Sequence, residues 1–169
     1  RVRRGDRVLV LGATGAAGQV ALQAAKLLGA AHVVAAGRDP KGLERALELG
    51  ADEAVALDGD FGEPNYVFDP LCGEPLERAV AAAAPGARVV QLGQSAGPAA
   101  SLPSAAIRGK QLELYGHSNF AVPAEALVEH YGRLAGHALA GEIELDIERI
   151  GLDELGAAWG RRGKLVVCL

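Results

Sequence analysis

The residues best suited to chemistry in this sequence are glycines that end an apolar run. In 8-VLVLGATGAAGQ-19, Gly12 is followed by Gly15 and Gly18, and Ala13 opens an A-x-G-x-x-G pattern. Gly15 is expected to let the backbone approach a ligand closely, and Gly18 to let the following helix pack tightly on the strand. The N–H groups that open a helix attract phosphate. The pattern predicts a pyrophosphate-binding turn. We assign to this turn Ala13, Thr14, Gly15, Ala16, Ala17 and Gly18.

A second set of candidate residues follows about 20 positions later, in 33-VVAAGRDPKG-42. Gly37 ends another apolar run, and Arg38 and Lys41 come soon after it. An acidic residue at this place bonds the ribose hydroxyls of NAD(H), whereas cations beside a glycine favour the 2′-phosphate of NADP(H). The sequence therefore favours NADP(H). NAD(H) is favoured instead if the carboxylate of Asp39 turns toward the ribose.

Both sets need a fold that brings the ends of successive strands to one edge. Apolar runs typical of buried strands alternate along the chain with segments of helical spacing. Strands are expected at 7–11, 32–36, 53–57, 66–68, 88–92 and 111–115, and helices at 17–28, 41–49, 75–84 and 123–139. This alternation predicts an α/β fold over residues 1–140, a doubly wound parallel six-stranded sheet of the Rossmann type.

Residues 141–169 follow a different pattern, and we expect them to form a C-terminal extension. Charged and apolar residues alternate over 142–147, a short helix is indicated at 152–159, and 164–169 is strand-like. Such a pattern fits either an edge hairpin or a segment that returns to another domain of a larger protein.

Composition excludes several classes of function. The formal net charge of -4 gives no reason to expect nucleic acid or an anionic membrane as a partner. No apolar run approaches the roughly 18 residues of a membrane span. Two distant cysteines predict no disulfide and fit a reducing, cytoplasmic location. The absence of C-x-x-C and H-E-x-x-H motifs leads us to expect no zinc site within the chain.

Other protein classes also use a glycine-rich turn. A phosphate-binding NTPase loop requires Lys after its last glycine, but Gly18 is followed by Gln19. Short-chain reductases require a Tyr with Lys four residues later, and none of the three tyrosines has one. A methyltransferase, which also binds an adenosyl group over such a turn, stays open.

Four stretches in order resemble the cofactor domain of the medium-chain dehydrogenase/reductase superfamily: 5-GDRVLVLGATGAAGQVALQAAKLLGA-30, 41-KGLERALELGADEAV-55, 66-YVFDPLCGEPLERAVAAAAPGARVVQLG-93 and 164-KLVV-167. The resemblance is strongest to the zinc-independent quinone oxidoreductase branch and covers nearly the whole chain. It implies an oxidoreductase that transfers hydride between NADPH and a quinone, an enone, or a carbonyl or alcohol substrate.

The resemblance also implies further cofactor contacts at the exits of the later strands. By position these are Asp69, Leu71, Leu92, Gly93, Gln94, Gly116 and Ser118, the last two near the nicotinamide. The family has a further catalytic domain that lines the substrate cleft. This chain alone is therefore expected to bind the cofactor without turning over, and the 141–169 extension is expected to return to that missing domain.

The sixth strand, residues 111–115, is expected at the edge of the sheet, and an open edge tends to pair with another chain. In the resembled family this strand pairs across a two-fold axis, and we predict a homodimer through it. A second class of function stays open, a nucleotide-binding module that senses or scaffolds without chemistry.

Overall fold

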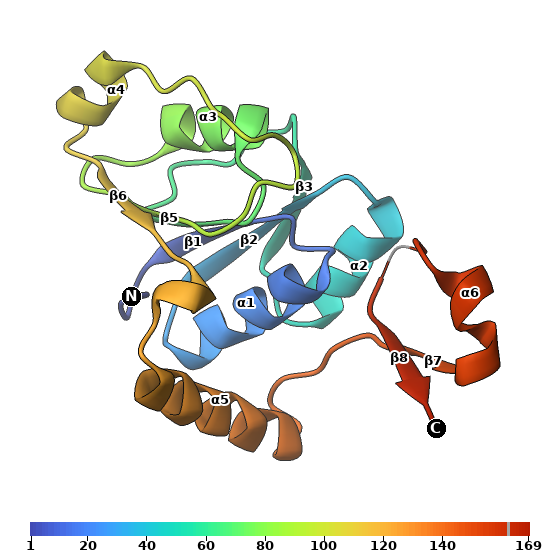
Figure 1. Ribbon diagram of the computed structural model, residues 1–169. Coiled ribbons are helices and arrows are strands. Elements are labelled where there is room, and N and C mark those ends of the chain that lie inside the picture. Colours follow the sequence, from blue (N-terminus) through green and yellow to red (C-terminus); the bar gives the residue numbers. More distant parts are fainter. Residues whose placement is uncertain (162) are drawn as a thin grey trace.

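The structure is a computed structural model that describes residues 1–161 and 163–169. Six parallel strands form one sheet in the order β3-β2-β1-β4-β5-β6 (Figure 1). They are β1 (Arg7–Leu11), β2 (His32–Gly37), β3 (Glu53–Ala56), β4 (Tyr66–Asp69), β5 (Arg88–Gln91) and β6 (Glu113–Gly116). The chain changes its direction of travel across the sheet between β1 and β4, which is the doubly wound Rossmann order predicted from the sequence.

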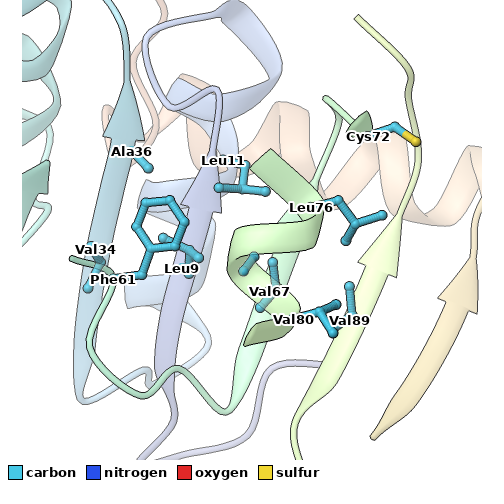
Figure 2. Packing of buried hydrophobic residues seen from close by; sticks show 11 residues of the cluster. Leu9, Leu11, Val34, Ala36, Phe61, Val67, Cys72, Leu76, Val80 and Val89 are labelled. Atoms are coloured by element: carbon cyan, nitrogen blue, oxygen red, sulfur yellow. The ribbon is translucent and has the colours of Figure 1, made fainter. Parts of the chain in front are cut away.

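Helices cover both faces of the sheet. The helices α1 (Ala16–Leu27) and α2 (Pro40–Glu48) lie on one face, and α3 (Gly73–Ala82) lies on the other (Figure 1). Successive residues of a strand point to opposite faces, so Val8 and Val10 pack toward α1 and α2, while Leu9 and Leu11 pack toward α3. Figure 2 shows this second cluster, in which Leu9 and Leu11 lie between β2 and α3. The sheet is therefore packed between two clusters of buried apolar side chains, one on each face.

The amino ends of the strands are joined by a buried ion pair. The Nη2 of Arg88, the first residue of β5, donates to both carboxylate oxygens of Asp6 at 2.8 and 2.7 Å. The two side chains are only 5% and 7% exposed. The guanidinium also lies 5.4 Å from the ring centroid of Tyr66 in β4. This pair ties the start of β1 to β4 and β5 at the opposite end of the sheet from the glycine-rich turn.

Two local expectations are corrected in the last third of the chain. The segment 93–110, interpreted as a loop, contains a short helix, α4 (Ser104–Gly109). The sixth strand begins at Glu113 and not at Gln111, because Gln111 has a φ of 52° and its N–H bonds the carbonyl of Arg108 in the turn that ends α4. After β6 come a short 3₁₀ turn, η1 (Asn119–Ala121), and the long helix α5 (Ala124–Leu139).

The C-terminal extension forms a small unit of its own beside α2 (Figure 1). It contains β7 (Glu148–Gly151), η2 (Leu152–Glu154), α6 (Leu155–Ala158) and β8 (Leu165–Cys168). The strands β7 and β8 pair in parallel in a separate two-stranded sheet, so the edge hairpin expected as one alternative is wrong. The alternating residues 142–147 form no strand, because the N–H groups of Glu144 and Asp146 bond glutamine side chains of α1.

Candidate cofactor-binding site

The glycine-rich turn joins β1 directly to α1. The N–H of Gly15 donates to the carbonyl of Gly12 at 3.0 Å, and Gly12 has a φ of 64°. A Cβ on Gly18 would lie 2.3 Å from that carbonyl oxygen, so only glycine lets the helix sit this close to the turn. A Cβ on Gly15 would have only one neighbour, 3.4 Å away. Packing therefore requires Gly18, whereas Gly15 leaves open space above the turn.

The start of α1 is an uncompensated helix end. The first hydrogen bond of the helix runs from the N–H of Gln19 to the carbonyl of Gly15, at 2.9 Å. The N–H groups of Ala16, Ala17 and Gly18 therefore have no partner within the helix. No side chain caps this end and its first turn holds no acidic residue. The turn borders a cleft of about 310 Å³. Free N–H groups and a positive helix end make this cleft suited to a phosphate.

The exit of β2 is packed against this turn. A Cβ on Gly37 would lie 2.6 Å from the methyl carbon of Thr14, and one on Gly42 would lie 2.7 Å from the Cβ of Thr14. The methyl group of Thr14 therefore lies where a side chain at position 37 would begin, and any larger residue there requires Thr14 to move.

The charged residues after β2 make different contacts. Asp39 caps α2, and its carboxylate accepts from the N–H of Gly42 at 2.9 Å, so it is directed at the helix start. Arg38 is exposed and lines the cleft above the glycine turn. Within the part of the chain that the structure describes, no carboxylate pairs with Arg38. Lys41 is exposed in the first turn of α2 and lies outside the cleft lining.

A second cleft of about 510 Å³ adjoins the first, and both are lined by Gly37, Arg38 and Leu71. Leu57 and Ser95 also line both clefts, and Asp58 and Arg78 line the second; none of these four was predicted as a site residue. The rule that ligands lie at strand carboxyl ends, applied to β3 as well, indicates Leu57 and Asp58. Ser95 follows β5 in the same way.

Arg78 of α3 holds the wall of this second cleft. Its guanidinium donates to the carbonyls of Leu57 at 3.1 Å and Gly59 at 3.0 Å, and it also bonds the carbonyl of Asp58. It lies 5.8 Å from the ring centroid of Phe61. The turn after β3 is therefore fixed from the side of α3, a contact that no local sequence pattern indicates.

The exit of β4 is shaped by Asp69 from inside the protein. One carboxylate oxygen accepts from the N–H groups of Leu71 and Cys72, both at 2.9 Å. The other oxygen has no partner among the described residues. Burial raises the pKa of Asp69, and the two N–H bonds offset part of that effect. Asp69 is fully buried, so it orders the turn that carries Leu71 and lies outside the cleft lining.

Two backbone features accompany that turn. Cys72 has φ 56° and ψ −160°, a conformation that residues other than glycine rarely adopt. A Cβ on Gly93 would lie 2.5 Å from the carbonyl oxygen of Pro70, so the exits of β4 and β5 touch through glycine. The strand ends are thus brought close together at the edge where the clefts lie.

A third cleft of about 420 Å³ lies at the exits of β5 and β6. Four residues predicted as cofactor contacts line it, namely Leu92, Gly93, Gln94 and Ser118. His117 lines it as well. The Nε2 of His117 lies 3.1 Å from the side-chain oxygen of Asn119. Gly116 is the last residue of β6 and does not line this cleft.

Most of the predicted site residues are therefore brought to the clefts along one edge. Those that line them are Thr14, Gly15, Ala16, Ala17, Gly18, Gly37, Arg38, Leu71, Leu92, Gly93, Gln94 and Ser118. Ala13, Lys41, Asp69 and Gly116 do not. Ala13 is fully buried beneath the turn.

Neither a metal cluster nor a membrane span is found in residues 1–161 and 163–169. No three His, Cys, Asp or Glu side chains there lie close enough to hold an ion together. No helix of that part combines the length and the apolar character that crossing a membrane requires.

The fold and the clefts together define a class of protein. A parallel sheet in Rossmann order, an uncapped helix start after a glycine-rich turn and a cation at the exit of β2 are features typical of dinucleotide-binding domains. A family model described as zinc-binding dehydrogenase matches residues 16–131, and the chain belongs to that family, as a cofactor-binding domain of the medium-chain dehydrogenase/reductase superfamily.

Known relatives are longer than this chain. A phenolphthiocerol/phthiocerol polyketide synthase protein of Mycobacterium tuberculosis is 35% identical over 106 residues, which are 56% of this chain and 5% of that protein. The quinone oxidoreductase of Thermus thermophilus, solved also with NADPH, superposes with a TM-score of 0.81 at 28% identity over 99% of this chain and 59% of that one. A putative zinc-binding dehydrogenase of Sinorhizobium meliloti 1021 bound to NADP has a TM-score of 0.82 at 25% identity over 99% and 54%.

Proposed function

We propose that the chain is the NADP(H)-binding domain of an oxidoreductase that transfers hydride between NADPH and a quinone, an enone, or a carbonyl or alcohol substrate. The observation that carries the proposal is the open start of α1 beside a cleft that Arg38 also lines. Similarity to oxidoreductases crystallised with NADPH or NADP supports it.

The clefts suggest a division of the cofactor along the edge of the sheet. The N–H groups of Ala16, Ala17 and Gly18 bind the pyrophosphate. Arg38, with Lys41 nearby, pairs with the 2′-phosphate through charge-assisted hydrogen bonds. The third cleft, lined by Gln94 and Ser118, receives the nicotinamide end. The nicotinamide, when bound, supplies or accepts the hydride, and the chain orients it.

The preference for NADP(H) rests on what the two charged groups after β2 already contact. The carboxylate of Asp39 is engaged by the start of α2 and does not compete for ribose hydroxyls. The guanidinium of Arg38 pairs with no carboxylate of the described residues and keeps its donors available for a phosphate.

We further propose that the substrate is bound by a catalytic domain outside this chain, so that the chain alone binds the cofactor without turning over. The chain spans only about half the length of the solved relatives. The similarity to a polyketide synthase protein supports a carbonyl-containing carbon chain among the possible substrates. The two free cysteines support the reducing cytoplasm as the location.

The proposal is tested by titrating the chain with NADPH and NADH, and repeating both titrations with Arg38→Ala. Loss of a charge-assisted contact of roughly 1.5–3 kcal/mol predicts NADPH binding about 10- to 150-fold weaker, with NADH binding changed less than about twofold. Arg108→Ala is the matched control, because Arg108 is on α4 and its Nε contacts Ser104 away from the clefts.

Equal, weak binding of both nucleotides to the unaltered chain would refute the assignment to NADP(H). Tight NADPH binding by a full-length protein that has no second domain and no catalytic partner would favour the non-catalytic module.

The edge strand β6 supports a further proposal, a homodimer formed through it. The strand lies at the end of the sheet and all four of its residues are exposed, including Leu114 and Tyr115. Light scattering on the unaltered chain and on Leu114→Lys tests this. The dimer is expected to be lost in the variant, and a monomer in both samples contradicts it.

A further inference from the structure

Two buried glutamines on α1 bond a segment more than one hundred residues away in the chain. Gln19 and Gln23 are 8% and 7% exposed and lie one helical turn apart. The side-chain amide of Gln23 pairs in both directions with the backbone of Glu144, at 2.7 and 2.8 Å. The side-chain oxygen of Gln19 accepts from the N–H of Asp146 at 3.1 Å. Buried amides need such partners, so residues 143–147, here called the crossing segment, are held on α1.

The carboxylate of Asp146 reaches both helices of this face. It accepts from the Nε2 of Gln19 on α1 at 3.2 Å, and from the Nε of Arg45 on α2 at 3.1 and 3.3 Å. Arg45 also pairs with the carboxylate of Glu144 at 3.1 Å. The carboxylate of Asp146 therefore bridges α1 to α2 directly, and the carboxylate of Glu144 adds a second contact to Arg45.

These two helices carry the two ends of the proposed phosphate-binding region. Gln19 follows Gly18 in the turn that faces the pyrophosphate cleft, and α2 follows Arg38. The start of α2 is seated on Thr14 through Gly42, where a Cβ would lie 2.7 Å from the Cβ of Thr14. The Asp146 bridge is a second attachment, farther along α2. Without it, α2 still packs on the sheet through Ala46 and still pairs with Glu144, but it loses its side-chain link to Gln19 of α1.

We propose that Asp146 is a positioning residue for the cofactor site, which fixes the spacing between the pyrophosphate-binding turn of α1 and the cation at the start of α2. The inference rests on the proposed binding of NADP(H). Its consequence is that discrimination between NADPH and NADH depends on a side chain that lines none of the described clefts. The bridge is half exposed, with 49% of the Asp146 side chain and 31% of the Arg45 side chain accessible, so a moderate effect is expected.

The test compares Asp146→Ala and Asp146→Asn with the unaltered chain in titrations with NADPH and NADH. The alanine variant is expected to bind NADPH about fivefold more weakly and NADH less than about twofold more weakly, because NADH does not use Arg38. The asparagine variant keeps an acceptor for Gln19 but loses the charge opposite Arg45. Its affinity for NADPH should therefore lie between that of the unaltered chain and that of the alanine variant. Glu142→Ala is the control, since Glu142 precedes the crossing segment directly but pairs with His137 of α5.

Hydrogen exchange without nucleotide provides a second readout, with faster exchange expected across α2 in Asp146→Ala. Unchanged discrimination in a chain that binds NADPH would overturn the inference and leave the proposed function intact. Equal weakening of both nucleotides, with a lower Tm, would show a purely structural role and also overturn it. An unaltered chain that binds neither nucleotide would remove the proposed function and this inference together.

Discussion

The central strands of the sheet and the region from β6 to α5 differ in the burial of their apolar residues. Leu9, Val67 and Val89 of the central strands are completely buried. Neither β6 nor α5 contains a buried residue, and Val128 and Tyr131 of α5 are 73% and 74% exposed. Both regions have ordinary secondary structure, so the difference lies in what covers them.

This difference indicates which region depends on the chain alone. The central strands bury their apolar side chains against α1, α2 and α3 of the same chain, and the clefts lie at the carboxyl ends of these strands. Apolar side chains gathered on an exposed face are typical of surfaces that another chain or domain covers. Nucleotide binding is therefore expected to survive changes on α5 and to fail with changes in the central sheet.

The largest effect is expected from breaking the buried pair at the amino ends of the strands. Asp6→Ala leaves the guanidinium of Arg88 buried without its carboxylate, which should lower the free energy of unfolding by about 3–5 kcal/mol. Urea denaturation measures this loss. The pair lies far from the clefts, so the folded fraction should keep its affinity for NADPH.

The double variant Asp6→Leu with Arg88→Met is the control for this prediction. Replacing both partners by apolar groups removes the unpaired charge, and much of the lost stability should return. If Asp6→Ala costs less than about 1 kcal/mol, the central sheet does not depend on the pair and the contrast between the two regions is weaker than stated.

A smaller effect is expected at Cys72, where the backbone adopts a glycine-like conformation beside the clefts. A β-branched side chain is a poorer fit at a positive φ than the thiol, so Cys72→Val should cost about 2 kcal/mol. Cys72→Gly relieves the strain but loses the packing of the thiol against the α3 cluster, and should stay within about 1 kcal/mol of the unaltered chain. Thermal unfolding with calorimetry measures both, and equal losses would contradict the assignment of strain.

The sequence predicted best the features whose signal is local. The strand 7–11 and the glycine pattern lie in one uninterrupted stretch, so both the strand and the cleft beside it could be predicted. The packing role of Gly18 was predicted in the same way and is confirmed by its approach to the carbonyl of Gly12. The contact of Gly37 with the methyl group of Thr14 could not be predicted, because it depends on how the strand is placed beside the turn.

Features that depend on distant contacts were missed or misplaced. The crossing segment looks like a strand in the sequence, but its N–H groups bond Gln19 and Gln23 on α1, so no strand forms there. Arg78 shapes the second cleft through carbonyls about 20 residues away. Nothing in the types or spacing of these residues specifies their partners, because polar side chains accept many partners and the fold selects among them.

The smallest effect is expected on the exposed face of α5, and it gives the sharpest contrast between the two regions. Tyr131→Ser changes a residue that is 74% exposed, so the free energy of unfolding should change by less than about 0.5 kcal/mol. Leu22→Ala on α1 is the matched comparison, since Leu22 is completely buried and its truncation should cost about 2–5 kcal/mol. Urea denaturation at several protein concentrations measures both. A loss in Tyr131→Ser that grows with protein concentration would mean that a second copy of the chain already covers this face, because association stabilises by mass action.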